Sequence, residues 1–172
     1  MSITWWPERF TISDDAGRAR FEVRNIPGFG VRLSLGVAGG EEVAAIRRRR
    51  RGRFQVIVRG QEVGLVRQRA ADRYDIHSPL GPVATAGDVA GGQYAITSDG
   101  TQRATVSRQL VRVDQPQSIG VDIGDDDHAA VLLATILAIE AVRYERGEAE
   151  FNPQALLALL NPLNWLRGGV WP

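Results

Sequence analysis

The chain contains no cysteine and no lysine among its 172 residues. Without cysteine, it has no disulfide, no thiolate metal ligand and no thiol nucleophile. Without lysine, it can be neither a Schiff-base enzyme nor a protein with a lysine-dependent phosphate-binding loop. All 21 basic residues are therefore arginines. A coding bias is the simplest explanation, because the two basic side chains differ chemically only at particular sites.

An excess of charge of one sign is also absent. The formal net charge is +1, so no global field indicates a nucleic-acid or membrane partner. Hydrophobic residues make up 44% of the chain and charged residues 24%, which is ordinary for a globular protein. The first residues show no basic stretch followed by an apolar run. We therefore expect no secretory signal and a cytoplasmic protein, peripheral to the membrane if it binds lipid.

The main pattern in the sequence is a series of alternating runs joined by glycine-containing turns. Alternation of apolar and polar residues is typical of strands with one buried face. A closed barrel suits such a series because closure removes exposed strand edges. The runs predict about eleven strands, at Arg9–Ser13, Arg18–Arg24, Val31–Leu35, Glu42–Arg48, Phe54–Val58, Glu62–Gln68, Arg73–His77, Pro82–Ala86, Tyr94–Thr97, Arg103–Arg108 and Ser118–Ile123.

One segment breaks this period. Ala129–Val142 is apolar on nearly every side, and a helix of that kind must be surrounded by lipid or by protein. It is shorter than the ~20 apolar residues of a bilayer span, and charged residues bracket it. We therefore predict a protein-enclosed helix whose first N–H groups are capped by the preceding acidic cluster, Asp125–Asp127. Glu140, inside the helix, should pair with an arginine at the barrel mouth or have a raised pKa.

The hairpin series and the segment that follows it resemble the LURP-one-related proteins. That segment reads Ser118-Ile-Gly-Val-Asp-Ile-Gly-Asp-Asp-Asp-His-Ala-Ala-Val-Leu-Leu-Ala-Thr-Ile-Leu-Ala-Ile-Glu-Ala-Val142. Their fold is shared with the Tubby C-terminal domain and the phospholipid scramblases. The resemblance covers residues 9–145. It implies a mainly β domain over residues 1–148, a closed antiparallel barrel of about 12 strands around a C-terminal hydrophobic helix. Residues 149–172 are expected to form a short, apolar helical tail.

The strongest charge feature is an arginine run that separates two predicted strands. Charge runs commonly form solvated hairpin tips, and this is one interpretation. The other is a site for phosphoinositide or other anionic head groups, because arginine pairs with phosphate through two hydrogen bonds. Any arginine on the inner face should lie beyond the rim or meet an acidic partner. The candidate anion-binding residues are Arg47, Arg48, Arg49, Arg50, Arg51 and Arg53.

Aromatic and leucine residues gather near both ends of the chain. Three interpretations remain open: a foot at a membrane interface, a surface for a protein partner or homodimer, and a tail that folds back over the first tryptophans. The residues concerned are Trp5, Trp6, Leu156, Leu160, Leu163, Trp165, Leu166 and Trp171.

Nothing in the sequence predicts catalysis. His77 and His128 are the only histidines, and neither has a second ligand at zinc spacing. Asp122 and Asp125–Asp127 lack the alternating pattern of a calcium loop. We therefore expect a non-catalytic binding or scaffold module without metal or cofactor. Its expected partner is an anionic lipid or membrane surface. The alternative is a protein partner or homodimer that binds the tail, and nucleic acid is a weaker one.

Overall fold

The computed structural model describes residues 9–13, 18–26, 31–70, 73–109, 118–123 and 128–146. These residues form one antiparallel sheet in which each strand pairs with its neighbours in sequence, followed by a helix. All the predicted strand positions are confirmed. The elements are β1 (Arg9–Ser13), β2 (Ala19–Asn25), β3 (Arg32–Val37), β4 (Glu42–Arg50), β5 (Arg53–Val58), β6 (Gln61–Ala70), β7 (Arg73–Ser78), β8 (Gly81–Asp88), β9 (Gln93–Ser98), β10 (Thr101–Gln109), β11 (Ser118–Ile123) and α1 (Ala129–Glu145).

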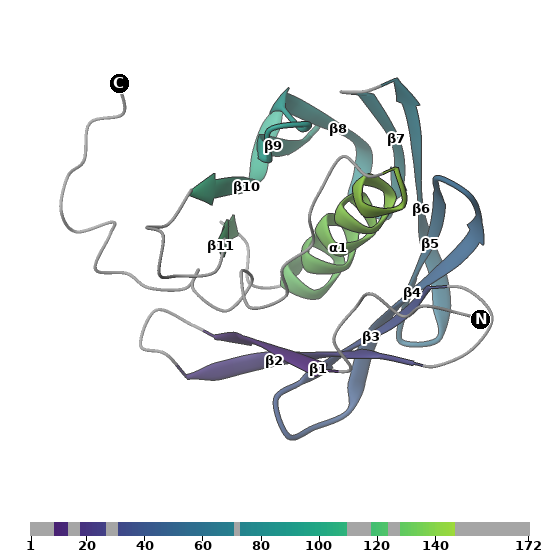
Figure 1. The fold of residues 1–172 in the computed structure, drawn as a ribbon, viewed down its shortest axis with the longest axis vertical. Helices are drawn as coiled ribbons and strands as arrows, with labels where there is room; N and C mark the ends of the chain where they lie inside the picture. The colour runs from purple at the N-terminus through teal and green to yellow at the C-terminus, as the bar shows by residue number, and fades with distance from the viewer. Residues whose placement is uncertain are drawn as a thin grey trace, which may run out of the picture.

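The sheet curls around α1 (Figure 1). Every helical residue from Leu132 to Arg143 is buried, so the predicted enclosure of the helix by protein is confirmed. Within the described part of the chain, no helix is long and apolar enough to cross a bilayer. The sheet has β1 and β11 at its two ends, and the described strands show no pairing between them. A closed barrel and a twelfth strand therefore stay predictions, and the tail, residues 149–172, lies outside the described residues.

The inner face of the sheet forms the core together with the helix. Alternate residues of β2–β6, β9 and β10 point inward and are almost completely buried, and each such side chain contributes about 1.5–3 kcal/mol by leaving water. Because the helix has no polar stripe, the strands on all sides of it need an apolar inner face. The inward residues of these strands include Val23, Leu33, Leu35, Ile46, Phe54, Val56, Val66, Ile96 and Val106.

The structure describes the first turn of the helix but not the acidic cluster before it. His128 occupies the N-cap position and makes no side-chain capping hydrogen bond. The first helical turn carries no acidic residue, because the helix begins at Ala129. Asp125–Asp127 lie outside the described residues, so their predicted capping role stays a prediction.

A close approach between β6 and β7 requires glycine at position 64. A Cβ atom there would lie 2.5 Å from the backbone oxygen of His77. We predict that Gly64→Ala lowers the free energy of unfolding by about 1–3 kcal/mol, because the strands must move apart. At Gly40 the nearest atom to an added Cβ is 3.5 Å away, so Gly40→Ala should stay within about 0.5 kcal/mol of the parent. Urea unfolding of both variants makes the test, and equal midpoints would contradict the packing argument.

Candidate functional site

Four arginines from four adjacent strands lie on the outer face of the sheet. Inner and outer positions alternate along a strand, so the residue next to a buried one faces outward. The neighbours that fix this assignment are all 0% exposed: Leu33, Ile46, Phe54 and Val66. We call the four outward residues the outer arginine face: Arg32 on β3, Arg47 on β4, Arg53 on β5 and Arg67 on β6.

The strand register sets arginine directly opposite arginine. Arg32 is the partner of Arg47 across β3 and β4, and Arg53 is the partner of Arg67 across β5 and β6. Arg50 also stands opposite Arg53 at the end of the β4–β5 hairpin. Like charges in directly opposed positions destabilise a sheet. This surface therefore concentrates positive charge at a cost to the fold.

Acidic residues neutralise only part of this charge. Arg49 donates to Gln55 Oε1 at 3.1 Å and to Glu62 Oε2 at 3.2 Å. Arg69, on β6, pairs with Asp75 on β7. Within the described ranges, the four residues of the outer arginine face have no ion-pair partner. The predicted run contributes two of these four, Arg47 and Arg53.

Arg48 points to the inner side of the sheet and meets an acidic partner there, as expected for an inward arginine. Its Nε lies 2.6 Å from Glu145 Oε1, at the last residue of α1. The other oxygen of the same carboxylate accepts a hydrogen bond from the N–H of Gly52 at 3.0 Å. Glu145 thus joins the end of the helix to the tip of the β4–β5 hairpin.

Glu140 pairs with an arginine, and this arginine lies on the same helix. Both of its oxygens accept hydrogen bonds from Arg143 Nη1 at 2.9 Å, one turn along the same helix. The two side chains are each 1% exposed. Arg143 also donates to the backbone oxygen of Ala90, and Tyr94 donates to Glu140 Oε1 over 3.4 Å. The pair is therefore a buried structural contact between the helix and the sheet.

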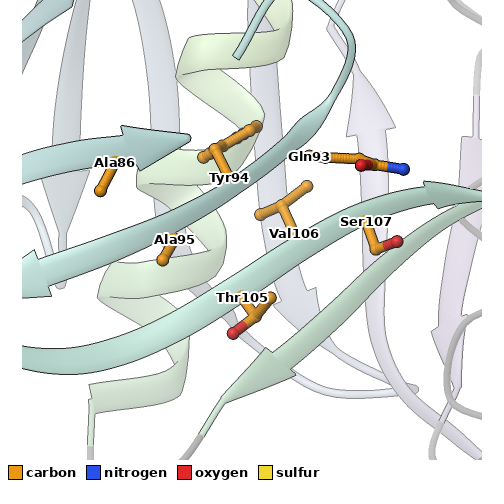
Figure 2. Close-up of a pocket in the computed structure, with 7 residues that line it drawn as sticks. All are labelled: Ala86, Gln93, Tyr94, Ala95, Thr105, Val106 and Ser107. Atoms are coloured by element: carbon orange, nitrogen blue, oxygen red, sulfur yellow. The ribbon is translucent and has the colours of Figure 1, made fainter. Parts of the chain in front are cut away.

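A shallow hollow of about 210 Å³ lies over β8, β9 and β10 (Figure 2). It is smaller than the ~300–1,000 Å³ of usual small-molecule pockets, and no charged side chain lines it. Tyr94 separates it from the buried Glu140. We therefore do not assign a ligand to it. Its lining residues are Ala86, Gln93, Tyr94, Ala95, Thr105, Val106 and Ser107.

Other residues singled out by the sequence have different outcomes. His77 and His128 are exposed and lie on separate elements. In the described ranges, no group of three His, Asp or Glu side chains is placed to hold a metal ion. The Trp and Leu residues of the two termini fall outside the described residues. The sequence reasoning missed Arg32 and Arg67, and counting residues back from the β5–β6 turn would have placed Val66 opposite Arg53, because a bulge beside Ile57 shifts the register by one residue.

Comparisons with known proteins give a fold relationship. No protein-family profile and no curated protein sequence matches the chain. The fold is similar to the X-ray structure of a protein from Arabidopsis thaliana, a LURP-one-related protein. The TM-score is 0.60 at 16% sequence identity, and the match covers 79% of this chain and 85% of that chain. At this identity the similarity shows a distantly shared fold and no more.

We predict that Arg143→Met costs about 3–5 kcal/mol of unfolding free energy, because it leaves the Glu140 carboxylate buried without its cation. The double variant Glu140→Leu/Arg143→Met should recover most of this loss, since it removes both charges from the core. Urea denaturation of the two variants and the parent gives the comparison. A single variant as stable as the parent would show that the pair does not hold the helix.

Tyr94 gives a prediction at alkaline pH. Burial, with the negative charge of Glu140 as a smaller cause, holds the pKa of Tyr94 well above its ordinary value of 10.0. Above pH 10 the unfolded chain loses this proton while the folded chain keeps it, so stability should fall as pH rises. Tyr94→Phe should flatten the decline, measured as unfolding free energy against pH. Tyr144→Phe is the comparison and should flatten the decline less, because burial raises the pKa of Tyr144 without a contribution from Glu140. A decline in Tyr94→Phe as steep as that of the parent would exclude Tyr94 as the cause.

Proposed function

We propose that this protein is a non-catalytic binding module that attaches to anionic lipid head groups at a membrane surface through its outer arginine face. The supporting observation is the set of opposed arginine pairs, Arg32 with Arg47 and Arg53 with Arg67. Opposed like charges cost stability in the free protein. An anion that lies between them turns the repulsion into attraction, so the arrangement favours a bound anion.

The chemistry of arginine narrows the ligand class. A guanidinium presents a planar set of donors that matches the oxygens of phosphate. It stays protonated at every physiological pH and so cannot act as a general base. The outer arginine face therefore supports binding rather than acid–base catalysis.

The shape of the site favours a surface over a small soluble ligand. The four arginines belong to four adjacent strands on the outside of the sheet, and none of them lines the hollow over β8, β9 and β10. A membrane presents many head groups at once, and each nearby arginine adds about 1 kcal/mol of attraction to an anionic leaflet. The resemblance to the Tubby-type fold, whose members bind phosphoinositides through basic strand residues, agrees with this choice at the level of fold.

Two alternative functions accompany this proposal, protein binding and nucleic-acid binding. A protein partner or homodimer would bind the tail, Phe151–Pro172. The leucine and tryptophan content of the tail supports this alternative. Nucleic acid would use the same arginines, but the formal net charge of +1 disfavours a long polyanion. Each alternative predicts a different result in the following experiment.

We predict that the protein co-sediments with phosphatidylcholine vesicles that contain phosphoinositide, and that binding weakens as salt is raised. Arg47→Ala/Arg53→Ala should weaken binding about thirtyfold, from about 1 kcal/mol for each arginine. The control, Arg20→Ala/Arg59→Asn, removes the same charge from exposed positions outside the face. Asn suits position 59 because its φ is +49°.

No vesicle binding at low salt would overturn the lipid proposal, as would equal losses in the two double variants. Binding that disappears only when Phe151–Pro172 are deleted would favour the tail. A gel shift with steep salt dependence, without vesicle binding, would favour nucleic acid.

A further inference from the structure

The tip of the β4–β5 hairpin already holds an anion, and that anion belongs to the protein. Glu145 places one oxygen 2.6 Å from Arg48 Nε and the other 3.0 Å from the N–H of Gly52. A guanidinium and a backbone N–H that converge on two oxygens of one group are the donors that proteins use to bind phosphate. The tip therefore has the geometry of an oxyanion site.

Local structure keeps this site open on its outer side. Gly52 has a φ of +67°, and nothing lies within 4 Å of the place where a Cβ would stand. Arg50 and Arg51 are exposed at the same tip, and neither forms an ion pair with another described residue. The tip thus carries two exposed arginines besides Arg48, the one that pairs with Glu145. The tip keeps an excess of positive charge even when Glu145 occupies it.

We propose that the β4–β5 hairpin tip is a binding site for a phosphate monoester, and that Glu145 is its internal, competing occupant. This deepens the proposed function, on which it rests for its choice of anion, but the tip and the outer arginine face use different residues. Arg48 and the Gly52 N–H bind the ligand at the tip, whereas Arg32, Arg47, Arg53 and Arg67 form the face.

The charge of a phosphate monoester makes it able to displace the carboxylate. Near pH 7 it carries about −1.5 to −2, against −1 for Glu145, and it offers three acceptor oxygens. The Arg48 side chain is 37% exposed and that of Glu145 is 10% exposed, so solvent already reaches the pair and weakens it. Glu145 competes because it is tethered nearby, which lowers the apparent affinity of an external ligand.

Displacement has a consequence for the helix. Glu145 is the last residue of α1, and its contacts with Arg48 and Gly52 link the end of the helix to the hairpin. A ligand that takes those donors removes this link and leaves the buried contacts of Glu140 and Arg143 in place. Occupation of the tip would thus release the end of the helix without opening the core.

The experiment follows the amide resonance of Gly52 while inorganic phosphate is added to the full chain. We expect a saturable shift in the parent and about five- to tenfold tighter binding in Glu145→Gln, which removes the competing charge. Glu41→Gln is the matched control, because Glu41 is exposed and directly precedes β4, at the end of the strand away from the hairpin tip. Arg48→Gln should weaken phosphate binding in both the parent and the Glu145→Gln background. Glu145→Asp, which keeps the charge on a shorter side chain, is the second variant if Glu145→Gln unfolds.

Vesicles that contain phosphatidic acid form a second arm, because that head group is itself a phosphate monoester. Tighter binding in both arms identifies a lipid source, and tighter binding of inorganic phosphate alone identifies a free one; either result supports the site. A Gly52 amide that does not respond to phosphate in Glu145→Gln overturns it, as does equal affinity in parent and variant. Failure of the proposed function is read separately, from the vesicle binding of Arg47→Ala/Arg53→Ala.

Discussion

Because α1 has apolar residues on every side, it is stable in water only when other parts of the chain cover its whole circumference. The observed burial of Leu132–Arg143 meets this requirement. It dictates a long antiparallel sheet that curls, and an inner face of apolar residues on the strands that surround the helix (Figure 1). The side chains of the interior therefore serve to hold the fold together. Charged side chains that are free to meet a partner can lie only on the outer face and at the strand ends.

Polar contacts then fix the orientation of the helix within the apolar inner face of the sheet. Apolar packing is non-directional and would tolerate rotation or sliding of a helix that looks the same from all sides. Arg143 donates to Ala90 in the β8–β9 turn, Glu140 accepts from Tyr94 on β9, and Glu145 contacts the β4–β5 hairpin. All three lie near the C-terminal end of the helix. This end therefore determines the orientation of the helix, and the apolar turns before it supply the burial.

The sequence predicts the elements well and their partners less well. Alternation and glycine turns located every strand that the structure describes, because these signals are local. The contact between Glu145 and Arg48 joins the end of the helix to a hairpin far away in the sequence, and no local pattern reports such a pairing. The register between β3 and β4, which places Arg32 opposite Arg47, is likewise set by the turn between those two strands and not by the arginine run itself. Arg143 was within reach of sequence reasoning, since residues three apart on a helix are neighbours, but the prediction named only an arginine at the barrel mouth.

The arginine run thus divides into groups with different tasks. Arg48 is held by the helix and Arg49 by Glu62, whereas Arg47 and Arg53 stand opposite other arginines on the outer face. A solvated hairpin tip, the simplest interpretation of the run, requires no such arrangement, because exposed charges can point apart into water. The register keeps the Cα atoms of the opposed pairs on adjacent strands close together, so the arginine side chains leave the sheet from neighbouring positions. The same backbone pairing that encloses the helix therefore concentrates the charge that an anionic surface would neutralise.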